Sequence, residues 1–448
     1  MSESSSPSNT QSTLSQEKSS GPESKTILQK TNGTAPVPGS SSANIDKQID
    51  RASALVDSIA SDAPSVELSV VMPCLNEADT LATCIEKCLS VFESEGLDAE
   101  VVVADNGSTD GSIEIAEKLG ARVVHVREKG YGNALMGGIS AARGKYVIMG
   151  DADDSYDFLE IPKFVTKLRE GKQLVQGCRL PSGGGKVLPD AMPFLHRWWG
   201  NPMFSAMVKK MFNAPINDVY CGLRGFRKDF YNELNLRCTG MEFATEMIIK
   251  SSVFEKDIAE VPITLHPDGR IAHAPHLRTF RDGWRTLRFF LMYSPKWLFQ
   301  IPGVVLLLTG MICFALAMPG VKVLGATLDA HTLLIGTLSI LLGCQMIQFA
   351  AFSKTFAVSE GLLPPSGRLY KALQSTSLEL GVAVGASMLV VGGVILALVF
   401  NEWRLSSFGQ LEYAKTMRMV IPGMTLAAIG FQTVISSFFL GILRMKRK

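Results

Sequence analysis

The sequence lacks the features of a nucleic-acid-binding, zinc-binding or secreted protein. Its 448 residues carry a net charge of only +2, and no basic stripe is interleaved with aromatic residues, so we expect no nucleic-acid partner. The eight cysteines form no CxxC pair and no Cys/His cluster with the spacing of zinc ligands, which favours reduced, buried thiols in a cytoplasmic domain. No apolar segment follows Met1, so we expect no signal peptide.

Large apolar residues are also scarce in the N-terminal segment 1–64, which is rich in Ser together with Pro, Gly, Thr and Asn. Such a composition cannot bury enough apolar surface to offset the entropy that is lost on ordering. We therefore predict that residues 1–64 form a disordered tail.

From Leu68 onward, short apolar runs alternate with segments of helical periodicity. The runs that predict strands are Leu68–Met72, Glu100–Ala104, Arg122–Val126 and Lys145–Met149, and the intervening helices are expected over 81–92, 112–119 and 133–142. This alternation predicts right-handed βαβ units, and hence an α/β domain in which helices cover both faces of a mostly parallel sheet. In such sheets, ligands bind at the C-terminal ends of the strands.

Long apolar runs appear only after residue 297. The four stretches of this kind are Leu298–Met318, Thr332–Phe352, Gly381–Phe400 and Val420–Leu443. Each is close to the roughly 20 residues that a helix needs to cross a bilayer. We therefore predict a transmembrane domain of four helices over 298–448.

Basic residues flank these stretches and indicate their orientation. They are Arg278, Arg281, Arg285, Arg288 and Lys296 before the first stretch, Lys354, Arg368 and Lys371 between the second and third, and Arg444, Lys446, Arg447 and Lys448 at the end. This distribution predicts an integral membrane protein whose catalytic domain and both termini are cytoplasmic, with the loop that holds Arg404, Lys415 and Arg418 as an exception. Residues 280–297 also place apolar and basic residues on different helical faces, which predicts an amphipathic juxtamembrane helix. It would serve either as a generic anchor or as a binder of an anionic lipid head.

Three polar motifs follow three of the predicted strands. Asp151-Ala-Asp153 follows the fourth strand, where two carboxylates on one side can hold Mg²⁺ or Mn²⁺ and so neutralise the diphosphate of a departing nucleotide. Asp105-Asn-Gly-Ser-Thr-Asp110 follows the second strand, and Pro73-Cys-Leu-Asn-Glu77 ends the first. Each motif alone is more often an ordinary turn or, for Glu77, a carboxylate at a helix N-terminus.

Together and in this order, the three motifs resemble those of the family 2 glycosyltransferases, which have a GT-A fold. The resemblance continues through Gln176-Gly-Cys-Arg179, Gly222-Leu-Arg-Gly-Phe-Arg227 and Glu260-Val-Pro-Ile263. With the basic juxtamembrane segment and the C-terminal spans, residues 68–443 look similar to dolichyl- or polyprenyl-phosphate mannose and glucose synthases. The resemblance implies a GT-A nucleotide-sugar domain over 65–279.

The resemblance also implies roles for individual residues. The positions that would bind the nucleotide are Pro73, Asn76, Glu77, Asp105 and Asp151, those that would hold the metal ion are Asp151 and Asp153, and the catalytic set would be Asp153, Arg179 and Arg197. The chain departs from its relatives in Cys74-Leu75, which lacks a Tyr for nucleoside stacking, and after Ile263, where a usual Arg and Gly-Ser-Lys element is missing. The phosphate-binding role of that element would then pass to Arg270 or Arg278.

A lipid phosphate is already an anionic nucleophile, so its transfer reaction requires no strong general base. The site needs a metal ion at the leaving diphosphate and arginines at the attacking phosphate, and direct attack would invert the anomeric centre. The arginines that we consider for the lipid phosphate are Arg224, Arg227, Arg270 and Arg278, with Arg179 and Arg197 as further candidates. Glu242 and Glu246 share one helix face, and we expect a structural or acceptor-orienting role for them.

The sequence thus predicts an inverting, metal-dependent hexosyltransferase with GDP-mannose or UDP-glucose as donor and a polyisoprenyl phosphate as acceptor; a homo-oligomer is compatible with it. One alternative is a processive polysaccharide synthase, but the Gln-x-x-Arg-Trp element of those enzymes fails here because Phe194 stands three residues before Arg197. The other is a non-catalytic membrane scaffold or lipid-translocation protein, against which the intact Asp105, Asp151 and Asp153 argue.

Overall fold

The computed structural model describes residues 66–270, 279–323 and 326–445. The predicted tail over 1–64 and the candidate Arg278 lie outside this part of the chain.

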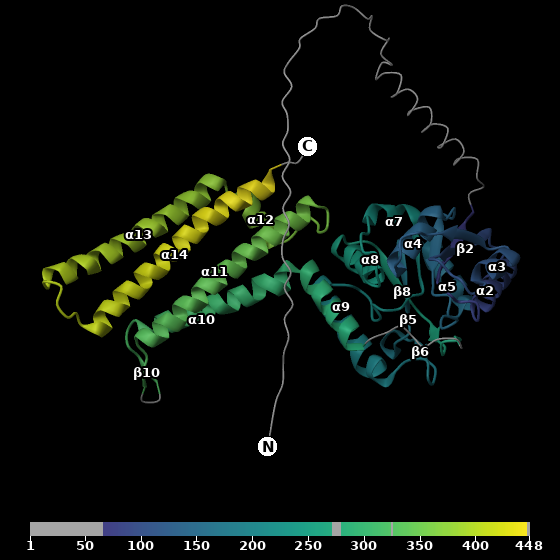
Figure 1. Cartoon of the computed structure of the whole chain (residues 1–448), viewed down its shortest axis with the longest axis horizontal. Helices are drawn as coiled ribbons and strands as arrows, with labels where there is room; N and C mark the ends of the chain where they lie inside the picture. The colour runs from purple at the N-terminus through teal and green to yellow at the C-terminus, as the bar shows by residue number, and fades with distance from the viewer. Residues whose placement is uncertain (1–65, 271–278, 324–325, 446–448) are drawn as a thin grey trace, which may run out of the picture. The chain divides into compact units, whose positions relative to one another are not determined.

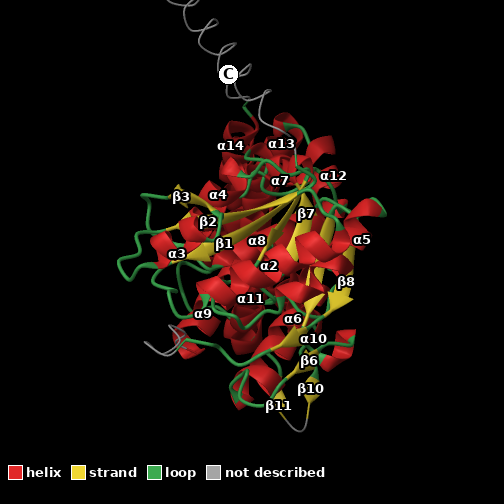
Figure 2. Cartoon of the chain, turned by 90° about the vertical axis from the view of Figure 1, so that its right-hand side faces the viewer, coloured by secondary structure: helices red, strands yellow, loops and turns green. Residues whose placement is uncertain are grey.

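Within the described residues, a seven-stranded sheet forms the centre of the N-terminal domain (Figure 2). In sheet order its strands are β3 (Arg122–His125), β2 (Ala99–Asp105), β1 (Leu68–Cys74), β4 (Tyr146–Met149), β7 (Arg224–Arg227), β5 (Leu174–Cys178) and β8 (Ile258–Pro262). Only β7 runs antiparallel to its neighbours, so the prediction of a mostly parallel sheet is confirmed.

Helices cover both faces of this sheet, as the sequence predicts. They are α2 (Leu81–Glu95), α3 (Ser112–Lys118), α4 (Tyr131–Ala141), α5 (Ile161–Arg169), α6 (Asn201–Phe212), α7 (Lys228–Leu234) and α8 (Glu242–Val253). The alternation of β1 decides which face receives which residue: Val70 and Met72 join the core layer that contains α2 and α5, whereas Val71 joins the layer of α4 and α8. Fully burying each of these side chains contributes about 1.5–3 kcal/mol to stability.

Among the described residues after 278, the elements are helices apart from the short antiparallel strands β10 (Lys322–Val323) and β11 (Ala326–Thr327). The helices are α9 (Thr279–Tyr293), the short π-helix η4 (Lys296–Gln300), α10 (Ile301–Ala317), α11 (Ala330–Ser359), α12 (Arg368–Ser375), α13 (Leu378–Leu405) and α14 (Tyr413–Arg444). In the described part of the chain, four helices are long and apolar enough to cross a membrane: Lys296–Ala317, Ala330–Ser359, Leu378–Leu405 and Tyr413–Arg444. The prediction of four membrane helices is therefore confirmed.

The membrane helices pack in the order α10, α11, α14 and α13, since α11 contacts both α10 and α14 and α13 contacts α14 (Figure 1). Glycines make the α13–α14 contact close. A Cβ at Gly430 would lie 2.5 Å from the backbone nitrogen of Leu389, and one at Gly392 would lie 2.6 Å from the carbonyl oxygen of Gly423. Small residues of this kind let two membrane helices approach and gain van der Waals contact in a solvent that offers no hydrophobic driving force.

Candidate active site

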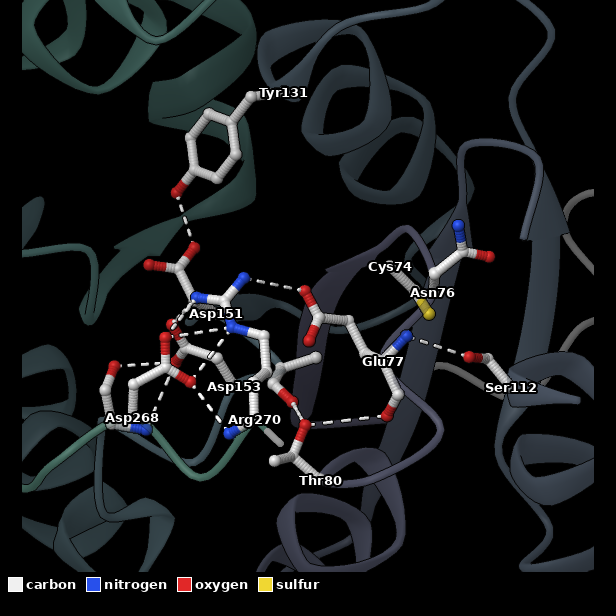
Figure 3. Close-up of polar contacts among 12 residues, drawn as sticks. Cys74, Asn76, Glu77, Thr80, Ser112, Tyr131, Asp151, Asp153, Asp268 and Arg270 are labelled. Atoms are coloured by element: carbon white, nitrogen blue, oxygen red, sulfur yellow. Dashed lines mark hydrogen bonds and ion pairs between the residues drawn. The ribbon is translucent and has the colours of Figure 1, made fainter. Parts of the chain in front are cut away.

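The polar motifs meet at one edge of the sheet because β1, β2 and β4 are parallel. Asp105 is the last residue of β2 and is paired in register with Cys74 at the end of β1. Asp151 and Asp153 come just after β4, and Figure 3 shows Arg270 between Asp153 and Glu77. The structure therefore brings together the carboxylates that the sequence predicts for the nucleotide and the metal ion.

Asp151 is the most perturbed carboxylate of this cluster. Its Oδ1 accepts a hydrogen bond of 2.9 Å from the hydroxyl of Tyr131, the first residue of α4 (Figure 3). Burial, followed by the nearby charge of Asp153, raises the pKa of Asp151 to about 6. A nearby positive charge would therefore stabilise the ionised form of Asp151.

Arg270 supplies positive charge to the cluster in this structure. Its Nη2 donates to Oδ2 of Asp153 at 2.7 Å, and its Nη1 lies 3.2 Å from Oε1 of Glu77. Asp268 also accepts from the Nε of Arg270, at 2.9 Å. The other oxygen of Asp153 accepts from the backbone nitrogen and hydroxyl of Ser155 at 3.1 and 2.6 Å. Both oxygens of Asp153 are therefore oriented, and Arg270 lies among three carboxylates.

The donor set at this edge fits a hard divalent cation. Asp151 and Asp153 offer carboxylate oxygens, which Mg²⁺ and Mn²⁺ prefer. No group of three or more His, Cys, Asp or Glu arranged to hold a metal ion occurs among the residues that the structure describes. Two carboxylates suit an ion that is bound jointly by protein and substrate phosphates, as Mg²⁺ commonly is.

The first two motifs are tied to each other by their own polar groups. The side-chain oxygen of Asn76, which has a φ of 61°, accepts from the backbone nitrogen of Thr109 at 2.8 Å. The hydroxyl of Ser108 accepts from the backbone nitrogen of Asn76 at 3.1 Å. Asp105 accepts from the nitrogen of Ser108 at 2.8 Å and lies 3.2 Å from Nδ1 of His125, and these bonds help to hold its pKa below the usual range against burial. This loop pair is a rigid candidate for the nucleoside site.

Arg179 lies behind the acidic cluster and is already paired. Its Nε and Nη2 donate to the two carboxylate oxygens of Asp218 at 2.8 and 3.0 Å, and both side chains are buried. Its Nη1 lies 3.4 Å from the hydroxyl of Tyr156. The positive charges of Arg179 and Arg270 both oppose the raised pKa of Asp151. Arg179 therefore contributes charge to the site, while Asp218 fixes its guanidinium.

Three of the four arginines predicted for the lipid phosphate are described, and the structure does not bring them together. Arg224 is 0% exposed and donates to the carbonyl oxygens of Cys221 and Ala244, both at 2.6 Å. Arg227 pairs in register with Tyr146 at the far end of β4 and forms an ion pair with its neighbour Asp229. Of these three described arginines, only Arg270 lies with the acidic cluster.

Arg197 lies in an exposed aromatic segment that sequence reasoning missed. It belongs to the short π-helix η3 (His196–Gly200), and its guanidinium lies 5.5 Å from the ring of Trp198. Phe194, Trp198 and Trp199 are 75%, 58% and 69% exposed. The dense run of aromatics around Arg197 was the available signal. We call Phe194, Arg197, Trp198 and Trp199 the aromatic segment.

The aromatic segment is attached to the elements that lead into the membrane. Helix α6 follows it directly, and Phe204 of α6 packs edge-on against Phe290 of α9 with ring centroids 6.0 Å apart. Further along α6, Nζ of Lys210 lies 5.4 Å from the ring of Trp297, at the start of the first span. The aromatic segment is thus followed by a helix that packs against α9 and against the start of the first span.

Comparison with known proteins places this architecture in a family. The model of the glycosyl transferase family 2 matches residues 69–234, and that of the glycosyltransferase family 2 C-terminal transmembrane region matches residues 351–444. The low-salt glycan biosynthesis hexosyltransferase Agl6 of Haloferax volcanii is 38% identical over 378 residues, which cover 84% of this chain and 89% of that protein. The dolichyl-phosphate hexose transferase of the same organism is 31% identical over 198 residues, or 44% of this chain and 82% of that protein.

A solved structure of glucosyl-3-phosphoglycerate synthase from Mycobacterium tuberculosis, in complex with Mn²⁺ and UDP, covers 51% of this chain and 78% of its own. Its identity of 22% and TM-score of 0.38 are too low to inform the function.

Proposed function

The chain belongs to the family 2 glycosyltransferases, and we propose that it transfers a hexose from a nucleotide sugar to a dolichyl or polyprenyl phosphate. The observation that carries this proposal is the acidic cluster at the ends of β1 and β4 in a chain with four membrane helices. A relative named as a dolichyl-phosphate hexose transferase supports the lipid acceptor. The basic residues that flank the spans favour the cytoplasmic face as the place of reaction.

On the donor side, the loops after β1 and β2 would bind the nucleoside of UDP-glucose or GDP-mannose. Asp105 is assigned to the base, because its carboxylate is oriented by Ser108 and His125 at the sheet edge. Pro73, Asn76 and Glu77 would form the other wall, and Asp151 would complete the nucleotide site.

A Mg²⁺ or Mn²⁺ ion bound at Asp151 and Asp153 would supply positive charge at the departing nucleoside diphosphate. Both carboxylates are oriented by hydrogen bonds, Asp151 by the hydroxyl of Tyr131 and Asp153 by that of Ser155. Arg270 is near enough to add a second positive charge, since it already contacts Asp153 and Glu77. Oriented charges of this kind stabilise a developing anion without reorganising during the reaction.

On the acceptor side, an oxygen of the lipid phosphate would attack the anomeric carbon as the bond to the diphosphate breaks. The electron pair leaves with the diphosphate, so the configuration inverts and an α-linked donor gives a β-linked product. Arg197 is the arginine that we assign to the incoming phosphate, because the helix that follows the aromatic segment packs against α9 and the start of the first span. Burial removes Arg224 from this role, and Arg227 lies at the wrong end of its strand.

The proposal is tested with the purified full chain in nanodiscs, supplied with polyprenyl phosphate, Mn²⁺ and either radiolabelled UDP-glucose or GDP-mannose. We expect label in the solvent-extractable lipid fraction with one donor, and its loss when the metal ion is chelated. Label in a polymer would instead favour a processive synthase. No transfer from either donor, with intact folding, would contradict the proposal.

A further inference from the structure

A buried carboxylate on α8 has no part in the proposed chemistry. Glu246 is 0% exposed. Its Oε2 accepts hydrogen bonds from the backbone nitrogens of Arg237 and Cys238 at 2.9 and 2.8 Å. Its Oε1 accepts from the hydroxyl of Tyr293 at 2.8 Å and forms an ion pair with Lys250 at 3.1 Å. These contacts offset the cost of burying the charge and hold the pKa of Glu246 below its usual range.

The partners of Glu246 come from two different places in the fold. Tyr293 is the last residue of α9, the amphipathic helix that leads into the first membrane span. Arg237 and Cys238 belong to the segment 237–240, which we call the bridging segment and which precedes α8. One carboxylate therefore joins the membrane-proximal helix to the bridging segment, and hydrogen bonds to a charged group are the strong ones.

The bridging segment in turn packs against the start of α4. The carbonyl oxygen of Thr239 accepts from the backbone nitrogen of Asn133 at 3.2 Å. A Cβ at Gly130 would lie 2.6 Å from that same oxygen, and one at Gly132 would lie 2.5 Å from the carbonyl oxygen of Cys238. Glycine on both sides of Tyr131 is thus what allows the contact.

Tyr131 is the residue between these two glycines, and its hydroxyl holds Asp151. We infer that Glu246 and Tyr293 are positioning residues. Their hydrogen bond connects α9 to the bridging segment and holds that segment against the start of α4. The start of α4 in turn holds Tyr131 in place to bond Asp151. The inference rests on the proposed function for the role of Asp151. Its consequence is that a displacement of α9 in the bilayer reaches the donor site through packed and hydrogen-bonded groups.

The first test needs no ligand. Tyr293→Phe removes only the hydroxyl that bonds Glu246. Tyr220→Phe is the matched control because its hydroxyl interacts with Thr286 of the same helix. Hydrogen exchange is measured by mass spectrometry on the full chain in nanodiscs. We expect faster exchange in peptides that contain residues 130–134 for Tyr293→Phe and unchanged exchange for Tyr220→Phe. Unchanged exchange there in Tyr293→Phe, or an equal rise in the control, would overturn the inference.

The second test asks whether the link matters to the donor. With whichever nucleotide sugar the wild-type chain uses, we expect Tyr293→Phe to raise the donor KM by about fivefold, the lower end of typical coupling between sites, with the acceptor KM unchanged. Combining Tyr293→Phe with Tyr131→Phe should cost less than the product of the single effects, since both act on Asp151. Multiplicative effects, or a rise confined to the acceptor KM, would refute the link. Faster exchange in a chain that transfers no hexose would leave the link standing and refute the proposed function.

Discussion

Replacement of Asp218 by Asn should strongly destabilise the catalytic domain. The carboxylate is 0% exposed and accepts from the backbone nitrogen, Nε and Nη2 of Arg179 at 3.0, 2.8 and 3.0 Å, and from the nitrogen of Tyr220 at 3.2 Å. An Asn side chain would keep one acceptor oxygen but would turn an NH₂ group toward donors. The guanidinium of Arg179 would remain buried without a countercharge.

The magnitude follows from burial. Breaking a buried ion pair by removing one partner costs about 3–5 kcal/mol, whereas an exposed pair contributes about 0–1 kcal/mol. The matched control is Asp257→Asn, which removes an ion pair of 2.9 Å with Lys172 in which the side chains are 57% and 34% exposed. For a domain of this size each kcal/mol lowers Tm by about 2–4 °C, so Asp218→Asn should lower it by about 6–20 °C.

Thermal unfolding of the purified full chain in detergent, followed by tryptophan fluorescence, measures the two variants side by side. The pH dependence of the stability also has a predicted direction. The pKa of Asp218 lies below its ordinary value of 3.8 despite burial, so its stabilisation is present above that value and is lost as the pH falls through the folded-state pKa. The stability of Asp218→Asn should therefore depend less on pH in this acid range. If the two variants unfold within about 1 kcal/mol of each other, the buried pair is not a structural support of the site.

Three further predictions concern the site, the membrane helices and the aromatic segment. The pKa of Asp151 is raised to about 6, and metal ligation needs the ionised carboxylate. Calorimetry with nucleotide present should therefore show an affinity for Mn²⁺ that falls as the pH is lowered through about 6. A midpoint near the ordinary carboxyl value of 3.8 would contradict this prediction. Gly430→Leu should reduce the folded fraction in detergent because the added side chain separates α13 from α14. Gly393→Leu should leave the folded fraction unchanged, because a Cβ at Gly393 meets no other atom of the described residues within 4 Å. Equal losses in the two variants would argue against close packing of α13 and α14. Brominated lipids in nanodiscs should quench tryptophan emission, and the quenching should fall in a Trp198→Phe/Trp199→Phe variant; unchanged quenching would place the segment away from the lipid.

The features that the sequence predicts well are those governed by local pattern. The strands β1, β2 and β4 are short and mostly apolar, and the polar motifs come at or just after their ends, so the strand-end cluster could be predicted. The membrane helices were equally visible, because a run of about 20 apolar residues is rare in a chain that does not cross a bilayer. Even so, α11 continues beyond the predicted end at Phe352 to Ser359, because its backbone hydrogen bonds continue past the end of the apolar run.

The features that could not be predicted depend on contacts between distant segments. The strand β7 (Arg224–Arg227) carries two arginines and shows no apolar alternation, so neither its place between β4 and β5 nor the burial of Arg224 could be read from its residues. The bond between Arg270 and Asp153 joins positions 117 residues apart, and the pair of Arg179 with Asp218 spans 39. In both pairs, the partner of the arginine, and therefore its role, follows from the folded structure and not from the local sequence.

The central claim, that Asp153 supports hexose transfer to a lipid phosphate, is tested most directly by Asp153→Asn in the radiolabel assay. Asp154→Asn is the matched control, because it removes the same charge one residue away, where the side chain pairs with Lys87 on α2. A bound metal ion contributes several kcal/mol of charge stabilisation, so we predict that Asp153→Asn lowers transfer to the lipid fraction by at least ~100-fold, while Asp154→Asn retains it. Undiminished lipid labelling by Asp153→Asn would contradict the account.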